Sequence, residues 1–314
     1  MTENDTIGVL LMAHGGPDKL EDIPEFLKHV LNGRPVPPPL VSEIEDNYRQ
    51  IGGSSPIRVL TQKQADALES KLNSQANGTT YKTYIAMKNW TPWIWDTVEQ
   101  IANDGIKKLV VIVLAPQYSS VIIGRYLKIF EQALEDKSAA FQYVAVDDFH
   151  DHPLMVKAWA ELIMGQKATM PDAHVVFSGH SIPVRIIDAG DPYSAQLEKT
   201  AQLVAKETGL ADDEWSLCYQ SSGRSREPWL GPEMCQHIMD LADDGHKNLL
   251  FATVGFVSEH VEVLYDVDVH ARQVAEKNGM KLERVQMLND HPLFVEALAD
   301  LVKQKERDLS WRKI

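Results

Sequence analysis

One stretch of the chain places carboxylates and an imidazole at a regular spacing. The segment Gly255–His270 reads Gly-Phe-Val-Ser-Glu-His-Val-Glu-Val-Leu-Tyr-Asp-Val-Asp-Val-His, so Glu262, Asp266 and His270 follow one another every four residues. In an α-helix capped by Ser258, this spacing brings the three side chains to one face, turned by only about 40° per step. Such a stripe could pass protons or hydrated cations. A solvated helix face is the simpler alternative, which the apolar neighbours of the stripe disfavour.

Two histidines each end an apolar run of strand length. The segments Leu10-Leu-Met-Ala-His-Gly-Gly-Pro17 and Val176-Phe-Ser-Gly-His-Ser-Ile-Pro183 place His14 and His180 after the run. Ligands bind at the carboxyl ends of strands in parallel α/β sheets, so the two imidazoles could face each other across a cleft. For either histidine alone, a hydrogen-bonded loop residue is the alternative. Their matching positions favour a function for the pair.

His180 and Glu262 are the strongest candidates for a catalytic pair. An imidazole and a carboxylate suit general-base catalysis or ligation of a divalent transition metal. The chain contains no His-Glu-x-x-His or similar three-ligand spacing, which disfavours a tightly held catalytic metal. A metal that passes through the site fits better than one that stays.

Other catalytic motifs have little support. Gly179-His-Ser-Ile-Pro183 is close to the Gly-x-Ser-x-Gly nucleophile elbow, but Pro183 replaces the last glycine, which lets a helix pack behind the serine. A hydrolase that uses Ser181 is therefore disfavoured. No Gly-x-Gly-x-x-Gly follows a strand and no P-loop occurs, so the sequence predicts no nucleotide site.

Apolar runs of strand length alternate with stretches of helical period, which predicts an α/β fold with parallel sheets. The predicted strands are Ile7–Ala13, Tyr81–Met87, Leu109–Leu114, Val175–Ser178, Ser216–Tyr219 and Leu249–Val254. Helices are predicted between them, including one that begins at the capping box Thr61-x-x-Gln64.

The chain also repeats itself. Four segments recur in the same order: Leu10–Pro17 with Val176–Pro183, Pro92–Ile94 with Pro228–Leu230, Asp104–Leu109 with Asp244–Leu249, and Asp151–Ala158 with Asp290–Ala297. The period is too long for a solenoid of short repeats. We therefore predict two similar α/β domains, with the functional site in a cleft between them.

Charge and composition disfavour several classes of protein. The 314 residues carry a net charge of −14, which leaves no basic excess for nucleic-acid binding. The two cysteines, Cys218 and Cys235, make neither a disulfide framework nor a four-cysteine cluster site. The polar segment Met1–Thr6 does not read as a signal peptide, and no apolar run approaches a membrane span. We expect a cytoplasmic protein.

Several segments together resemble the ferrochelatases, enzymes that insert Fe(II) into a porphyrin to make haem. The likeness runs nearly end to end and is carried by Met12–Pro17, Ile51–Pro56, Leu114–Ser119, Ser178–Pro183, Gly190–Tyr193, Gln220–Arg224, Glu227–Pro232 and Gly255–Asp266. It implies two Rossmann-like domains, with parallel sheets flanked by helices, around a porphyrin cleft. We expect them to comprise residues 1–118 and 119–290, with a C-terminal helix in 291–314 packed back on the first domain.

The resemblance implies roles for single residues. His180 would accept pyrrole protons or contact the iron with Glu262 as its partner, while Asp266 and His270 would form an outer ladder for metal or protons. His14 would contact the substrate and could ligate iron from the opposite face. The other implied substrate-binding residues are Tyr48, Ser55, Lys88 and Tyr126.

The resemblance also bears on substrate and cofactors. Coproporphyrin III is the favoured porphyrin, because the N-terminal region is compact and no membrane-binding extension is evident; protoporphyrin IX is the alternative. Fe(II) is a substrate, and no tightly bound cofactor is expected. The C-terminal cysteines that hold an iron–sulfur cluster in some members do not occur, so no such cluster is expected.

Two other functions stay open at this point. One is a cobalt or nickel chelatase that acts on a precorrin-type ring, which His14 keeps open. The other is a non-catalytic tetrapyrrole-binding protein, which would not need Glu262 beside His180. We expect a monomer that binds porphyrin and haem, with a weakly bound haem-transfer partner and no nucleic acid.

Overall fold

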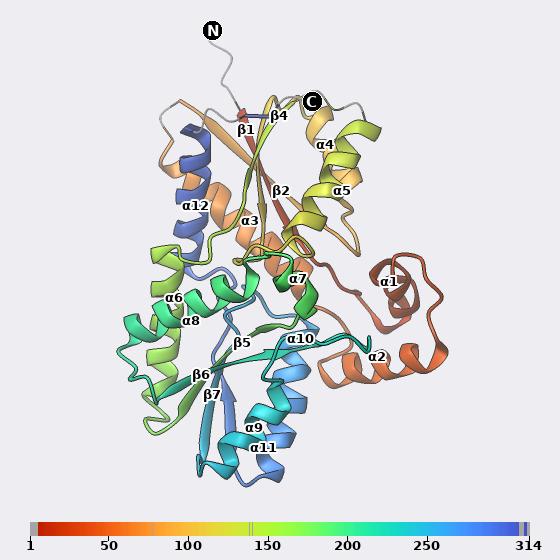
Figure 1. Ribbon diagram of the computed structural model, residues 1–314. Helices are drawn as coiled ribbons and strands as arrows, with labels where there is room; N and C mark the ends of the chain where they lie inside the picture. Colours follow the sequence, from red (N-terminus) through yellow and green to blue (C-terminus); the bar gives the residue numbers. More distant parts are fainter. Residues whose placement is uncertain (1–5, 77, 138, 140, 308–310, 313–314) are drawn as a thin grey trace.

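The computed structural model describes residues 6–76, 78–137, 139, 141–307 and 311–312. Two four-stranded parallel sheets form its frame, with strand orders β2-β1-β3-β4 and β6-β5-β7-β8. Their strands are β1 (Thr6–Ala13), β2 (Thr80–Met87), β3 (Lys108–Val113), β4 (Gln142–Val146), β5 (His174–His180), β6 (Trp215–Gln220), β7 (Asn248–Ala252) and β8 (Lys281–Arg284). Figure 1 shows the first sheet above the second. The predicted α/β fold with two parallel sheets is confirmed.

All six predicted strands are present, because each is an apolar run with helices packed against both faces of its sheet. β1, for example, is buried from Ile7 to Ala13, which is typical of a central strand in a parallel sheet. The sequence does not predict the edge strands β4 and β8. β8 is only four residues long and reads Lys-Leu-Glu-Arg with Leu282 alone fully buried. β4 reads Gln-Tyr-Val-Ala-Val and is buried from Tyr143 to Val146, so its apolar run was overlooked.

Helices cover both faces of each sheet. On the first sheet, apolar side chains of α3 and α12 pack on one face and those of α4 and α5 on the other. On the second sheet, α6 and α8 cover one face, and α9 and α11 cover the other. The helices are α1 (Ile23–Val30), α2 (Pro38–Gln50), α3 (Ile57–Ser74), α4 (Ile94–Asn103), α5 (Ile123–Asp136), α6 (Pro153–Lys167), α7 (Val184–Asp188), α8 (Tyr193–Thr208), α9 (Met234–Asp243), α10 (Val261–Leu264), α11 (Arg272–Lys277) and α12 (Pro292–Arg307).

The internal repeat of the sequence appears in the fold. β5 to β8 take the same order in their sheet as β1 to β4 do in theirs. α4 and α9 each span ten residues and are followed by a glycine with positive φ, Gly105 or Gly245. α6 and α12 both begin at a His-Pro pair, and the Nδ1 atoms of His152 and His291 each accept a hydrogen bond, at 3.3 Å, from the backbone two residues on.

One of the four recurrences is wrong in detail. The equivalent of Pro92 is Pro232 and not Pro228. Met87 N donates to Pro92 O at 2.7 Å just before α4, and Tyr219 N donates to Pro232 O at 2.9 Å just before α9. The Pro-Trp pair misled the comparison, because it lies four residues too early in the second half.

The expected division at residues 118 and 119 does not follow the sheets. β4 pairs in register with β3, from Lys108 with Gln142 to Ile112 with Val146, so a boundary at 118 would cut the first sheet. The C-terminal helix α12 contacts α3 and α6. One apolar cluster therefore runs through side chains of both sheets.

Two buried amides also join the halves. Gln64 Nε2 on α3 donates to Ser258 Oγ at 3.0 Å and to Asn289 O at 2.8 Å. Gln117 Nε2 donates to Thr200 Oγ1 at 3.0 Å. Gln64 is thus not part of a capping box, because α3 begins at Ile57. Among the described residues, no helix combines the length and the apolar character needed to cross a membrane.

Candidate functional site

His180 and Glu262 meet at the carboxyl end of the second sheet. His180 is the last residue of β5, and Glu262 lies on the short helix α10. His180 Nε2 lies 3.6 Å from Glu262 Oε1, and His260 Nε2 lies 3.5 Å from Glu262 Oε2. The carboxylate therefore lies between two imidazoles. His260 was not predicted from the sequence, where its only signal is its position two residues before Glu262.

Two glycines allow this approach of β5 to the loop after β7. A Cβ on Gly179 would lie 2.6 Å from Leu197 Cδ2 of α8. A Cβ on Gly255 would lie 2.6 Å from the Gly179 Cα atom. Neither contact is tolerated without movement of the backbone or the core. These glycines let the segment that carries Glu262 lie directly against the strand that carries His180.

The predicted helix from Ser258 through His270 differs in two respects. Helix α10 begins at Val261, so Ser258 does not cap it; the Ser258 hydroxyl instead accepts the hydrogen bond from Gln64. Residues Asp266–Ala271 then form a π-helix, in which His270 N donates to Tyr265 O at 2.9 Å. The wider turn is common at functional sites.

Exposure increases along the predicted ladder. Glu262 and Asp266 are partly buried, whereas His270 is exposed. At the outer end, Cys235 Sγ lies 3.9 Å from His270 Nδ1. The three side chains thus lead from the His180 contact toward solvent, as the four-residue spacing predicts, although the helix that carries them is not a regular α-helix.

The two carboxyl groups of the ladder have opposite electrostatic environments. Burial alone raises the pKa of Glu262, but the imidazoles of His180 and His260 outweigh it and hold that pKa well below its ordinary value. Burial raises the pKa of Asp266 to about 6, against a hydrogen bond donated by Ser221 that lowers it. Glu262 therefore stays ionised near neutral pH, and Asp266 can exchange a proton there.

His14 lies at the end of the first sheet with both ring nitrogens engaged. Asn89 Nδ2 donates to its Nε2 at 2.8 Å, and its Nδ1 donates to Gly15 O at 3.0 Å. Burial and then the charge of Lys88 lower the pKa of His14 to about 4. The ring is neutral, and it could ligate iron through Nε2 only if Asn89 moved away.

The other implied substrate residues differ in accessibility. Lys88 Nζ lies 5.1 Å from the ring centroid of Tyr126, and burial with Arg125 lowers its pKa to about 8. Tyr48 is 1% exposed and Ser55 7%, so both are packed rather than open. Ser55 N also donates to Pro17 O at 2.9 Å, which fixes the loop after His14.

The charge of Glu262 links residues from both halves of the chain. Burial is the largest influence on the pKa of five predicted site residues, and the negative charge of Glu262 acts on each of them as well: His14, Tyr48, Lys88, Tyr126 and Asp266. For His14 and Lys88 it opposes a pKa that is lowered overall. Together with His180, these residues surround one carboxylate. The fold thus brings together side chains that are up to about 250 positions apart in the sequence.

Two polar residues at the end of β6 hold the Glu262 segment, and the sequence analysis did not single them out. Gln220 is fully buried; its Nε2 donates to Glu262 O at 2.5 Å, and its Oε1 accepts from Ser178 Oγ at 2.8 Å. Ser221 has φ of 58°, a conformation that costs energy outside glycine. From this position it donates its hydroxyl hydrogen bond to Asp266.

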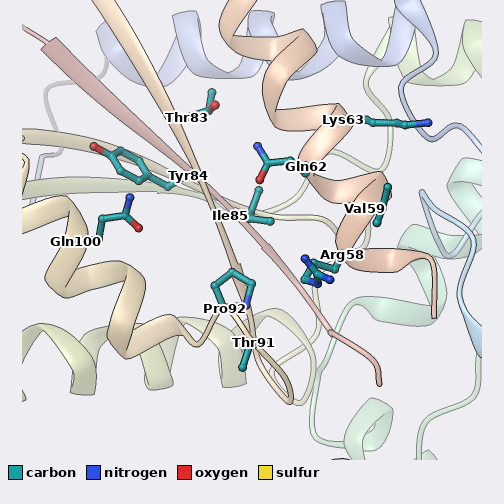
Figure 2. A pocket seen from close by; sticks show the side chains of 10 residues that line it. All are labelled: Arg58, Val59, Gln62, Lys63, Thr83, Tyr84, Ile85, Thr91, Pro92 and Gln100. Carbon is teal, nitrogen blue, oxygen red and sulfur yellow. The ribbon is translucent and has the colours of Figure 1, made fainter. Parts of the chain in front are cut away.

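A surface cavity of about 700 Å³ lies elsewhere, between α3, α4 and the edge strand β2 (Figure 2). It is lined by Arg58, Val59, Gln62, Lys63, Thr83, Tyr84, Ile85, Thr91, Pro92 and Gln100. None of the predicted site residues contributes to it.

Ser181, at the position that resembles a nucleophile elbow, is 1% exposed and donates to Leu230 O at 2.9 Å. This contact gives the hydroxyl a structural role and not that of a nucleophile.

Comparison with solved structures identifies the class of fold. The sirohydrochlorin chelatase SirB from Bacillus subtilis subspecies spizizenii, in complex with cobalt, superposes with a TM-score of 0.56 over 95% of this chain and 94% of that one, at 11% identity. CbiX, described as the terminal enzyme for biosynthesis of sirohaem in denitrifying bacteria, gives 0.54 over 95% and 98%, at 13% identity. This chain therefore has the two-domain fold of the chelatases.

Sequence comparison identifies the family. The family model described as ferrochelatase matches residues 6–306. The chain is 42% identical to a ferrochelatase from Deinococcus radiodurans over 99% of both chains, and 38% identical to a coproporphyrin III ferrochelatase from Geobacillus kaustophilus over 96% of both. The chain belongs to the ferrochelatase family, and it is an enzyme of haem biosynthesis that inserts iron into a porphyrin.

Proposed function

We propose that this enzyme inserts Fe(II) into coproporphyrin III, with His180 and Glu262 handling the metal and the pyrrole protons. The observation that carries the proposal is the Glu262 carboxylate between His180 and His260, at 3.6 and 3.5 Å. A porphyrin loses two pyrrole protons as a divalent metal enters. The reaction therefore needs groups that accept protons near neutral pH, beside an anion that attracts the cation.

The residues divide this work according to their charge. The His180 imidazole accepts a pyrrole proton, since neutral imidazole is the side chain best suited to do so near pH 7. Glu262 stays ionised, so it stabilises the resulting imidazolium and presents an oxygen to the entering Fe(II). Asp266, with its pKa of about 6, takes protons onward to solvent. His180 and Glu262 thus act on the same pyrrole nitrogen from one side of the ring.

Coproporphyrin III is the preferred substrate. Relatives at 36 to 38% identity from several Bacillota carry the name coproporphyrin III ferrochelatase. Lys88 supplies a cation for one of the four propionates of this porphyrin. Protoporphyrin IX is the alternative substrate, because the relative at 42% identity is named ferrochelatase without a porphyrin.

Several further expectations belong to this proposal. The protein works without a resident cofactor or iron–sulfur cluster, as a monomer in the cytoplasm. It passes haem to a weakly bound partner. His14 contacts the porphyrin face opposite His180. Metal analysis, sedimentation and cell fractionation test these points separately from the choice of substrate.

The decisive experiment compares the two porphyrins under anaerobic conditions. Fe(II) is added to the folded protein with coproporphyrin III or protoporphyrin IX, and the visible absorption spectrum is followed. We expect kcat/KM for coproporphyrin III to exceed that for protoporphyrin IX at least tenfold. A higher value for protoporphyrin IX would assign that substrate instead. No spectral change with either porphyrin would overturn the proposal.

A further inference from the structure

Three histidines meet at the amino end of the second sheet, the opposite end from His180. His174 begins β5, His237 lies on α9, and His246 lies in the turn before β7. The rings of His174 and His246 are 4.5 Å apart, centroid to centroid, and tilted by 53°. His174 Nε2 and His237 Nε2 contact the same hydroxyl, Ser216 Oγ, at 2.9 and 2.7 Å. Since β5 rises about 3.3 Å per residue, this cluster is roughly 20 Å from His180.

The His174 ring has a buried nitrogen without a partner. The residue is only 6% exposed, and its buried Nδ1 atom makes no well-formed hydrogen bond, although the backbone of Asp213 lies close enough to act on the pKa of the ring. Neither ring nitrogen of His246 makes a hydrogen bond to another described residue. An unpaired polar atom in a dry site costs about 1–3 kcal/mol, so its presence calls for a ligand.

The other half of the chain shows that the fold does not need these imidazoles. Gly8 pairs with Leu109 in the first sheet as His174 pairs with Leu249 in the second, so Gly8 occupies the equivalent position. The equivalent of His246 is Ile106, which likewise follows an Asp-Gly turn. A Cβ on Gly8 would lie only 3.0 Å from Ile106 Cγ2. The first half fills this place with close apolar packing, and the second half fills it with two imidazoles.

We propose that His174 and His246 bind a divalent transition-metal ion at the amino end of the second sheet, separate from the chelation site. His174 would ligate through Nδ1 while its Nε2–H donates to Ser216, which is the usual arrangement of a metal-ligating histidine. His246 supplies the second imidazole, and water completes the coordination. Imidazole ligands select borderline cations such as Zn²⁺, Co²⁺, Ni²⁺ and Fe²⁺.

The surroundings tolerate an added cation. The nearby ammonium of Lys167 is paired with Glu214 at 2.9 Å. Asp240 and Asp244 lie close enough to His237 to raise its pKa against the effect of burial. His174 itself is neutral at pH 7, because burial and the other two imidazoles lower its pKa to about 4. A ligand histidine has to be neutral, so the ring is ready to bind.

A second group of potential ligands serves as the matched control. Among the described residues, Asp148, His150 and Asp151 place ligand atoms within 4.8 Å of one another. Their polar atoms already have partners, since His150 Nδ1 is hydrogen-bonded to Asp148 Oδ1 at 2.6 Å and Asp151 is exposed to water. No buried, unpartnered atom points to a ligand there.

The test is calorimetric titration of Zn²⁺ into chelator-treated protein carrying His180→Ala and Glu262→Ala, which removes the proposed chelation site. We expect one Zn²⁺ per chain, at least tenfold weaker binding after His246→Ala or His174→Gln, and unchanged binding after His150→Asn. Zn²⁺ should also raise the melting temperature of the parent variant but not that of the His246→Ala variant.

Each outcome of this titration either supports or overturns the site at His174 and His246. Absence of Zn²⁺ binding to the parent variant overturns the site, as does binding that survives both histidine substitutions. Loss of binding in the His150→Asn variant would assign the ion to Asp148, His150 and Asp151. Because the His246 side chain makes no hydrogen bond to a described residue, and its backbone bond to Leu241 O is kept in the variant, His246→Ala should leave the circular dichroism spectrum unchanged. Iron insertion by the unmodified enzyme is measured separately, so failure here leaves the proposed function standing.

Discussion

At the scale of single residues, the site separates two carboxyl groups by their surroundings. Two imidazoles keep Glu262 ionised, while burial brings the pKa of Asp266 to about 6. Groups whose pKa values are pushed apart in this way commonly take different roles in one reaction. Glu262 is suited to hold charge beside iron and imidazolium, and Asp266 to carry protons.

Replacement of Glu262 by glutamine tests this division of roles between Glu262 and Asp266. Glu262→Gln keeps the shape but removes the anion, so we expect kcat for Fe(II) insertion to fall at least 100-fold, within the range of acid–base and charge effects. Asp266→Asn should cost less, about tenfold, because water can replace a relay group. Anaerobic initial rates measure both. The exposed Glu276→Gln variant is the control and should keep full rate; equal rates for the Glu262→Gln variant and the parent enzyme would refute the assignment.

Lys88 predicts a pH dependence of substrate binding. Its pKa is lowered to about 8, so the ammonium is present below that pH and is lost above it. We expect KM for coproporphyrin III to stay level up to about pH 8 and then rise, as the contact with a propionate disappears. Lys88→Arg should extend the level region, because guanidinium stays charged. Lys88→Met should raise KM throughout and abolish the rise. A profile that is the same in all three proteins would remove Lys88 from the site.

At the scale of elements, the residue pattern predicted six of the described strands and the approach of Glu262 to His180, but not the exact form of the helix that carries Glu262. The four-residue spacing of Glu262, Asp266 and His270 is compatible with an α-helix and, nearly as well, with a π-turn. What sets the wider turn is not visible locally: Gln220 and Ser221, more than 40 positions earlier, bind the segment through Glu262 O and the Asp266 carboxyl. Such distant contacts have no signature in the sequence around position 262.

Gln220 therefore stabilises the segment measurably. Gln220→Leu leaves the Ser178 hydroxyl and the Glu262 carbonyl without their partner, and each orphaned group costs about 1–3 kcal/mol. We expect the free energy of unfolding in urea to fall by about 2–4 kcal/mol. The exposed Gln132→Leu variant should change it by less than about 0.5 kcal/mol. An unfolding midpoint unaltered by Gln220→Leu would show that these hydrogen bonds contribute little.

At the scale of the whole molecule, the repeat in the sequence predicted two like sheets because the same turns and helix starts recur. It could not predict the division of the chain. The apolar run from Tyr143 to Val146 in β4 was overlooked, and its pairing with β3 places that strand in the first sheet. The four-position shift of Pro228 against Pro232 similarly hid which proline is equivalent to Pro92. Equivalence became visible only through backbone hydrogen bonds.

The stability of the molecule should decrease in acid for a definite reason. The pKa values of His14 and His174 are lowered to about 4 in the folded protein, from an ordinary value of 6.5. Between these pH values the unfolded chain binds more protons than the folded one. The contribution of the two histidines to the free energy of unfolding is therefore fully present above pH 6.5 and is lost as the pH drops toward 4. In metal-free buffer, His174→Gln should make the free energy of unfolding less dependent on pH, by the equivalent of about one bound proton. Urea titrations across this range measure the slope, and an unchanged slope would contradict the lowered pKa.

The position of α12 has a consequence for biosynthesis. This helix, made last among those described, covers α3, which is made among the first. Leu301 and Val302 of α12 belong to the same apolar cluster as Leu68 and Leu72 of α3. Until the ribosome has translated α12, these α3 side chains lack this cover, so the first half of the enzyme cannot complete its core before that helix is made. A nascent chain of this enzyme is thus a natural client for chaperones that hold exposed apolar helices.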